Sequence, residues 1–221
     1  MPINVRVAYR RDLESSDLPQ SNDNLSLSLT FVYVQSDGSG SDVTNSGVSI
    51  LNVVSGDGTN VEDEICIDTE CFYVISSTDE VITMLSKNNI TLTDVPVQHS
   101  SMNPTVFSSD TKKGINYSDY NGSIVEQYVN NYYDYLTTLG IVPVEARLIT
   151  SDELVKLGCS MEEYICPYES FITSTSYWTG SAYDFENIWY IDSDTIFEYR
   201  EYSSNFSAGI RPVIVLSRSV L

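Results

Sequence analysis

GIRPVIVLS, residues 209–217, carries the clearest indication of the fold in this sequence. Nearly every residue from Ile210 to Leu216 is apolar, without the polar alternation of a strand that has one face in water. A strand that is apolar on both faces belongs in the middle of a sheet. The sequence therefore predicts a central strand here, which needs a partner strand on each side.

Three short apolar runs upstream can supply such partners. They are EICI (64–67), CFYVIS (71–76) and VITMLSK (81–87), and turn residues separate each run from the next. Short β-favouring runs with turns between them are typical of an antiparallel meander.

The N-terminal part of the chain has a different texture. Leu25 to Gln35 alternates apolar and polar residues, which indicates a long half-buried strand, and Ile3 to Tyr9 and Val48 to Val54 are two further strand candidates. Ser36 to Gly47 is rich in Ser, Gly, Asp and Asn, which is typical of a linker or loop. The sequence predicts a β-rich N-terminal segment (1–60) followed by a main domain (61–221).

Two helices are predicted ahead of the C-terminal strands. The first begins after Ser123, whose hydroxyl can cap it while Glu126 reaches back, and it ends at Gly140. The second repeats this pattern between Thr150 and Gly158, again with a glutamate three residues after the cap. Strands, two helices and strands again make an α+β domain with short antiparallel strands.

The four cysteines form two closely spaced pairs, Cys66 with Cys71 and Cys159 with Cys166. A zinc site is disfavoured, because CxxC spacing and neighbouring histidines are both missing. We expect two local disulfides, which implies an oxidising compartment. The alternative is four ordinary buried thiols.

The charge of the chain restricts its partners. The formal net charge is -20, which repels the phosphates of nucleic acid and anionic lipid surfaces. The alternatives are that this charge serves solubility, or that it attracts calcium or a cationic ligand. No apolar run approaches the roughly 20 residues of a membrane helix, so we expect any export signal or membrane anchor to lie upstream of Met1.

Several motifs resemble a family of C-type-lectin-like domains in bacterial surface and phage-associated proteins. They are ARLITSDELVKLGC (146–159), TSYWTGSAY (175–183), NIWYIDSD (187–194), GIRPVIVLS (209–217) and, upstream, EDEICIDTECFYVISSTDEVITMLSK (62–87). The layout is also similar to the formylglycine-generating-enzyme subset and to the variable proteins of diversity-generating retroelements. The resemblance covers about residues 62–221 and implies a C-type-lectin-like fold for the main domain.

The same resemblance implies that C-terminal strands and loops present a ligand-binding surface. Its supporting positions would be Trp178, Gly180, Ser181, Trp189, Gly209, Arg211 and Pro212. Its presenting positions would be Tyr183, Asp184, Phe185, Glu186, Asn187, Phe197, Glu198, Tyr199, Arg200, Tyr202 and Asn205, with Tyr177 and Tyr190 beside them. Tyr, Ser and Asn are also the residues that paratopes use. The alternative is that these tyrosines pack in the interior, and we expect Trp189 in the core.

We expect an extracellular ligand-recognition protein, an adhesin or receptor-binding module, on a cell or virion surface. Its partner would be a protein or glycan on another cell or surface. The alternative is a structural subunit of a filament, pilus or phage tail, with Leu25 to Gln35 as a pairing edge. Glu186, Glu198 and Glu201 occupy expected variable positions and argue against current retroelement diversification, which cannot produce glutamate there.

We do not expect an enzyme, and no cofactor is required. Oxidase chemistry of the formylglycine-generating type needs reactive cysteines near the end of the fold, and none follows Cys166. The only histidine, His99, is interpreted as a surface residue rather than the base of a triad. Asp192 and Asp194 could contribute to a calcium site, but a solvated strand end is the favoured interpretation, because the sequence has no dense ligand loop such as DxDxDG.

Overall fold

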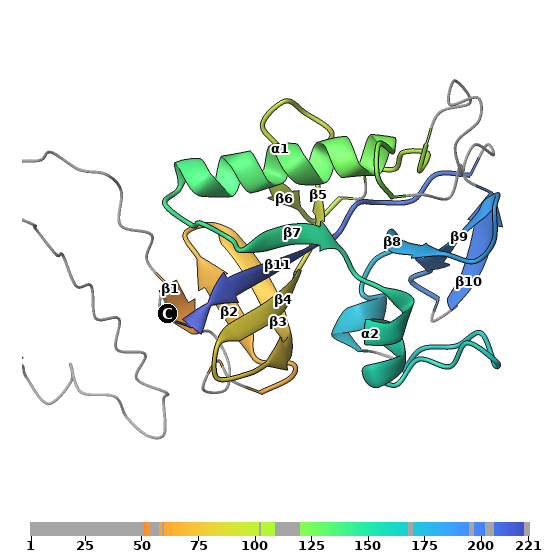
Figure 1. Ribbon diagram of the computed structural model, residues 1–221, viewed down its shortest axis with the longest axis horizontal. Coiled ribbons are helices and arrows are strands. Elements are labelled where there is room, and N and C mark those ends of the chain that lie inside the picture. Colours follow the sequence, from red (N-terminus) through yellow and green to blue (C-terminus); the bar gives the residue numbers. More distant parts are fainter. Residues whose placement is uncertain are drawn as a thin grey trace, which may run out of the picture. The chain divides into compact units, whose positions relative to one another are not determined.

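Strand β11 (Pro212–Ser217) is an internal strand of a six-stranded antiparallel sheet. It pairs with β4 (Val81–Ser86) on one side and with β7 (Glu145–Leu148) on the other, and the sheet order is β1-β2-β3-β4-β11-β7 (Figure 1). Val213 is buried in one core cluster, while Ile214 and Leu216 are buried in another. Both faces of the strand are covered, so the predicted central strand is confirmed.

The computed structural model describes part of the chain. The residues that it describes are 51–53, 58, 60–101, 103–108, 120–167, 170–194, 197–201 and 206–218. The chain divides into two compact units, Met1–Phe31 and Val32–Leu221, and every described residue belongs to the second unit. The predicted strands at Ile3 to Tyr9 and Leu25 to Gln35, and the predicted linker, lie outside the described residues.

The predicted meander is confirmed. Strands β2 (Glu64–Ile67), β3 (Glu70–Ser77) and β4 follow one another as antiparallel neighbours. Strand β1 (Leu51–Val53), within the predicted strand Val48 to Val54, pairs with β2 at the edge of the sheet.

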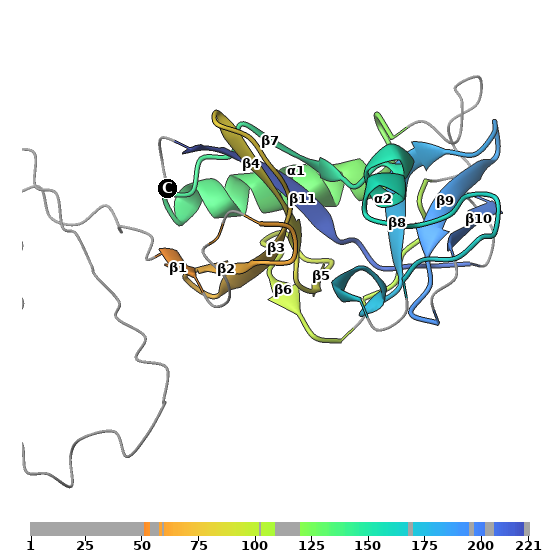
Figure 2. The ribbon, with the colours of Figure 1, turned by 90° about the horizontal axis from the view of Figure 1, so that it is seen from below.

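A second sheet lies at the end of the unit opposite β1 (Figure 1, Figure 2). It contains β8 (Tyr177–Ala182), β9 (Asn187–Ile191) and β10 (Phe197–Glu201), with β9 in the middle. A third sheet consists of only β5 (Asn89–Ile90) and β6 (Gln98–His99). All strand pairs in the three sheets are antiparallel.

Both predicted helices are present, with their caps. Helix α1 (Ile124–Thr138) begins at Ser123, whose hydroxyl accepts the N–H of Glu126 at 3.1 Å. The Glu126 carboxylate accepts the N–H of Gly122 rather than that of Ser123, so the reciprocal bond of a capping box is displaced by one residue. Helix α2 (Ser151–Lys156) has the complete capping box between Thr150 and Glu153, and a 3-10 turn, η2 (Phe171–Thr173), precedes β8.

The predicted α+β, C-type-lectin-like fold class is wrong for the described residues. They form three antiparallel sheets with only two α-helices, one of them six residues long, so the architecture is mainly β. Because both helices have strong capping signals, the prediction from sequence gave helix a larger share of the fold than the structure has. The short strands β5, β6 and β7 have too little apolar periodicity to be recognised there.

One buried cation joins the two larger sheets. The Arg211 guanidinium donates to the carbonyl of Ser86 at 2.6 Å and to those of Phe171 and Ile172 at 2.8 and 3.0 Å. Its central carbon also lies 5.2 Å from the ring centroid of Tyr177. Arg211 is fully buried, and these oxygens, which bind its Nε and Nη1 atoms, and the ring replace part of the water that it loses on folding.

A buried carboxylate attaches α1 to the meander. Glu70 is 1% exposed and accepts the hydroxyl hydrogen of Tyr132 at 2.6 Å and the backbone N–H of Gln98 at 3.2 Å. The Gln98 side-chain amide in turn donates to the Tyr132 hydroxyl at 3.1 Å. Burial raises the pKa of Glu70 above its ordinary value of 4.5, because desolvation disfavours the charged form.

Gly209→Ala should destabilise the protein by about 2 kcal/mol. A β-carbon at this position would lie 2.2 Å from the amide nitrogen of Asn89, which is held by bonds to Thr175 and to the Ser176 carbonyl. Urea unfolding measures the loss. Gly180→Ala is the matched control, because its β-carbon would meet Leu148 at an ordinary 3.4 Å; equal effects of the two changes would contradict the clash.

Glu70→Gln should become relatively more stable than the unchanged protein as pH rises. The pKa of Glu70 is raised by folding, so its stabilisation is complete below the ordinary value of 4.5 and is lost as pH rises through the raised value. The measurement is the difference in unfolding free energy between the two proteins from acid to neutral pH.

Glu153→Gln is the control with the opposite sign. Burial opposes ionisation of Glu153, but hydrogen bonds from Arg147 and Thr150 outweigh it and lower the pKa below 4.5. The stabilisation from Glu153 is therefore present above pH 4.5 and is lost as the pH falls through the lowered pKa of the folded protein. A slope of the same sign for both variants would contradict the assigned shifts.

Candidate functional site

Three tyrosine rings surround Trp189 on one face of the β8–β10 sheet. Tyr183 and Tyr199 are stacked, with ring centroids 3.8 Å apart and planes inclined by 2°. Both meet Trp189 edge-on, at 5.1 and 5.9 Å, and Tyr164 lies 6.1 Å from Trp189 and 6.4 Å from Tyr199. Tyr183 is 44% exposed and Tyr164 is 41% exposed. We call Tyr164, Tyr183 and Tyr199 the aromatic surface.

The strand register explains why these rings meet. Tyr199 pairs directly with Trp189 across β10 and β9, and side chains of paired residues share a face of the sheet. Trp189 is 4% exposed and belongs to a core cluster with Phe197 and Ile191, as predicted for Trp189. The exposed tyrosines therefore rest on a fixed aromatic base.

The turn between β8 and β9 is held by one carboxylate. Oδ1 of Asp184 accepts the backbone N–H groups of Glu186 and Asn187 at 2.9 and 2.8 Å, and the side-chain amide of Asn187 at 2.9 Å. These bonds, first the one from Glu186, lower the pKa of Asp184 below its ordinary 3.8. Asp184 thus fixes the turn that carries Tyr183 and the exposed Phe185.

A disulfide closes the loop that carries the third tyrosine. Cys159 and Cys166 are bonded, and inside this loop the backbone groups of Ser160 and Ile165 exchange hydrogen bonds at 2.7 and 3.2 Å. Tyr164 has a φ of 58°, a left-handed conformation that costs a residue other than glycine about 1 kcal/mol or more. The loop holds Tyr164 in this conformation, beside Trp189.

The aromatic surface lies in an acidic part of the chain. No Lys, Arg or His occurs between Leu157 and Tyr199. Glu162, Glu163, Asp184 and Glu186 are exposed in the two loops that carry Tyr164 and Tyr183. Their charges surround the tyrosines with a negative potential.

The predicted ligand-binding residues fall into four groups, the last of which is the pair Glu198 and Arg200. Tyr183, Asp184, Phe185 and Glu186 are exposed, and Asn187 and Tyr199 are half-buried, so these lie at or beside the aromatic surface. Tyr177, Tyr190 and Phe197 are at most 1% exposed, so the prediction that they present a binding surface is wrong. Tyr202 and Asn205 lie outside the described residues.

Glu198 and Arg200 are accessible but face away from the aromatic surface. Their ion pair lies against Tyr190, whose hydroxyl donates to Glu198 at 2.8 Å, and the Arg200 guanidinium lies 5.5 Å from the Tyr190 ring centroid. Burial and the bond to Glu198 raise the pKa of Tyr190. Glu198 and Arg200 therefore stabilise the opposite face of the β8–β10 sheet.

Sequence reasoning missed Tyr164 and the 48% exposed Ile165. The signal that could have found them is an aromatic and an apolar residue inside a short loop between two cysteines. Such a loop has no room for a core of its own, so large apolar residues within it tend to face outward or pack on a neighbouring element.

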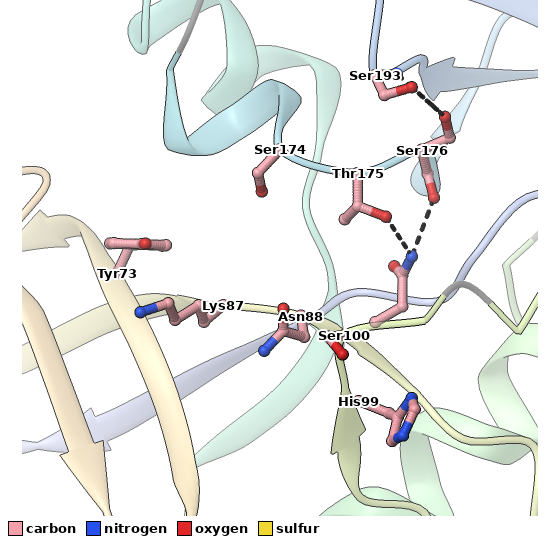
Figure 3. Close-up of a pocket in the computed structure, with 10 residues that line it drawn as sticks. Tyr73, Lys87, Asn88, His99, Ser100, Ser174, Thr175, Ser176 and Ser193 are labelled. Atoms are coloured by element: carbon pink, nitrogen blue, oxygen red, sulfur yellow. Dashed lines mark hydrogen bonds between the residues drawn. The ribbon is translucent and has the colours of Figure 1, made fainter.

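A polar pocket of about 360 Å³ lies at the other end of β8 and β9 (Figure 3). Its walls come from Tyr73 and residues 87–89, from His99 and Ser100, and from residues 174–176 with Ser193. Asn89 is 1% exposed, and its amide nitrogen donates to Thr175 Oγ1 at 2.8 Å and to the Ser176 carbonyl at 3.2 Å. His99, predicted as a surface residue, is exposed and lines this pocket.

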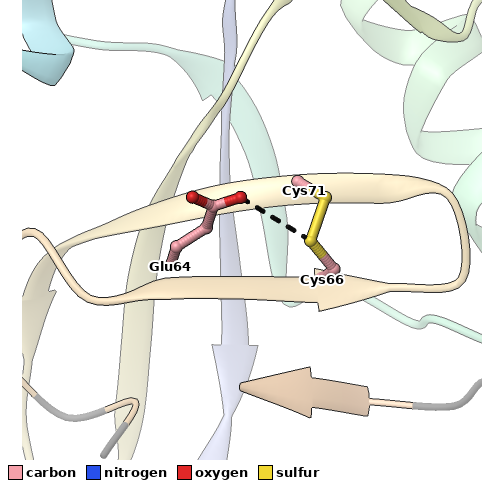
Figure 4. A group of neighbouring side chains, drawn as sticks. All are labelled: Glu64, Cys66 and Cys71. Carbon is pink, nitrogen blue, oxygen red and sulfur yellow. Dashed lines mark hydrogen bonds between the residues drawn. A yellow bond between two sulfur atoms is a disulfide. The ribbon is translucent and has the colours of Figure 1, made fainter. Parts of the chain in front are cut away.

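Glu64, Cys66 and Cys71 form the one cluster of potential metal-ligating groups found among the described residues (Figure 4). The two cysteines are directly paired across β2 and β3 and form the predicted disulfide, so neither sulfur is a thiolate that could bind a metal. Glu64 is engaged by Lys87 at 2.7 Å. Asp192, the first acid of the possible calcium pair, accepts the Ser176 hydroxyl at 3.1 Å.

No protein-family model, curated protein or solved structure matches the chain. The resemblance to C-type-lectin-like proteins stays a prediction. Within the part of the chain that the structure describes, no helix has the length and apolar character to cross a membrane.

Asp184→Ala should loosen the β8–β9 turn without unfolding the protein. It removes the acceptor of the Glu186 and Asn187 N–H groups, so their amide hydrogens should exchange faster in NMR while the melting temperature changes little. Glu186→Ala is the control, because the Glu186 carboxylate accepts neither of these bonds. Unchanged exchange in Asp184→Ala would show that Asp184 does not hold the turn.

Proposed function

We propose that the protein is an extracellular ligand-recognition protein whose aromatic surface binds the basic surface of a partner protein. The observation that carries the proposal is the stacked pair Tyr183 and Tyr199, which lies over Trp189 and is partly open to solvent. Tyrosine is enriched in protein interfaces because it offers a large rigid area and a hydroxyl group.

Preorganisation supports this role. Three features order the aromatic surface in the free protein. They are the disulfide-closed loop that contains Tyr164, the hydrogen bonds of Asp184 in the β8–β9 turn, and the edge contacts with Trp189. A surface that is ordered in the free protein loses less conformational entropy on binding. A strained residue such as Tyr164, with its φ of 58°, is also more frequent at functional sites than elsewhere.

Charge indicates the kind of partner. Four exposed carboxylates flank the tyrosines, and the chain has no basic residue between Leu157 and Tyr199. An acidic partner would be repelled, whereas a surface rich in Lys and Arg would be attracted and could place these cations over the tyrosine rings. A basic protein surface therefore fits both the aromatic rings and the charge of the site.

The disulfides support an extracellular location for this activity. Cys66–Cys71 and Cys159–Cys166 are both formed, and the described residues include no free cysteine. Disulfides form and persist in oxidising compartments and are rare in the cytosol. The second of them closes the loop that carries Tyr164, so binding would depend on the formation of this disulfide.

The double variant Tyr183→Ala/Tyr199→Ala should abolish partner binding and leave the fold intact. An array of extracellular proteins of known surface charge, together with glycans, is probed with the purified chain. We expect the bound proteins to be basic, and their affinity to fall with added salt because screening weakens the attraction. Loss of binding in the double variant without a large fall in melting temperature supports the proposal.

Tyr133→Ala is the matched control, since Tyr133 is a half-buried tyrosine on α1, outside the aromatic surface. It should bind like the unchanged protein. The proposal is wrong if no array protein binds, if the bound proteins are acidic, or if the double variant loses binding only in proportion to its loss of folded protein.

A further inference from the structure

We infer that the polar pocket beside Asn89 is a second binding site and that it takes a neutral saccharide. The pocket has a volume of about 360 Å³, within the range of small-molecule sites. It differs from the aromatic surface in place and in chemistry, so the inference does not depend on the proposed function.

Asn89 is an ordered part of the pocket wall. Asn89 uses both hydrogens of its amide nitrogen, on Thr175 and on the Ser176 carbonyl. Because a carbonyl can only accept, the bond to Ser176 also fixes which end of the Asn89 amide is nitrogen. Oδ1 of Asn89 is buried and has no hydrogen-bond donor in the protein, and the two bonds from the amide nitrogen fix the side chain as a rigid part of the pocket wall.

Close packing against Gly209 restricts the position of the Asn89 side chain. Gly209 lies so close that a β-carbon there would come within 2.2 to 2.6 Å of all three side-chain amide atoms of Asn89. Asn89 therefore cannot move toward Gly209, and it keeps its place in the pocket wall.

The charge of the lining selects a neutral ligand. No carboxylate lines the pocket, although the chain carries 31 acidic residues, so a cationic ligand would find no counter-ion there. The Lys87 ammonium is already engaged by Glu64 at 2.7 Å, so an anion would have to compete with a carboxylate. A neutral molecule meets neither obstacle.

The remaining groups suit a ligand rich in hydroxyls. Serine and threonine hydroxyls, together with the Asn88 side-chain amide, can both donate and accept. The Nδ1 atom of His99 accepts the N–H of Ser101 at 3.1 Å, so the neutral imidazole carries its hydrogen on Nε2 and offers a further donor. Tyr73 adds an apolar ring to the wall, against which the C–H face of a sugar can pack (Figure 3).

The two sites lie at opposite ends of the same strand pair. Ser176 directly precedes β8 and Ser193 follows β9, whereas Tyr183 lies in the turn that joins the other ends of these strands. A saccharide in the pocket leaves the aromatic surface uncovered. One molecule could therefore hold a glycan and a protein at the same time.

The experiment titrates the purified chain with neutral mono- and disaccharides, and with their uronic-acid and amino-sugar counterparts, by NMR and calorimetry. We expect a neutral sugar to bind best and to shift the amide signals of Asn88, Asn89 and Thr175. Asn88→Ala should weaken this binding about tenfold, the loss of one good hydrogen bond. The backbone N–H of Asn88, which donates to Gln98, is retained in this variant, so the fold is kept.

Two controls keep the result specific to the pocket. Asn103→Ala changes a half-buried asparagine that is not part of the lining, and it should bind sugar normally. The variant Tyr183→Ala/Tyr199→Ala should also bind sugar normally. The inference is overturned if no sugar binds, if only a charged sugar binds, or if Asn88→Ala binds as tightly as the unchanged protein.

Discussion

The two larger sheets and the turn η2 meet around the buried charge of Arg211. An unpaired guanidinium inside a protein is very costly, so carbonyl oxygens must meet it from several directions. They come from the end of β4 and from η2, with the Tyr177 ring at the start of β8. Moving the two larger sheets relative to one another would break the contacts of Arg211 with Ser86 or with Tyr177, so Arg211 fixes how the sheets meet.

This constraint also determines where the two candidate sites can form. With the start of β8 held against Arg211, residues 174–176 are placed beside Asn89, and the pocket is closed on that side. The other end of β8 then projects from the core, and Asp184 and the disulfide loop order the residues at this end. Rigid support at one end and local bonds at the other let exposed aromatic rings stay in place without being buried.

Local signals in the sequence predicted local structure well. The apolar run of β11, the meander and the capping box of Thr150 with Glu153 each depend on residues close together in the chain, and each is present. The fold class was wrong because the short strands β5 and β6 carry little pattern. Tyr164 beside Trp189, and Asn89 beside Gly209, are contacts between distant segments, which periodicity and spacing cannot reveal.

The lack of basic residues between Leu157 and Tyr199 has a consequence for survival outside a cell. Trypsin-like proteases cut after lysine or arginine, and in this region the candidates are only Lys156 and Arg200, at its two borders. Exposed loop tips are where proteolytic nicking usually occurs, yet the tips that carry Tyr164 and Tyr183 offer such an enzyme nothing to cut. These two loops would thus escape trypsin-like proteases, which would cut comparable loops rich in lysine.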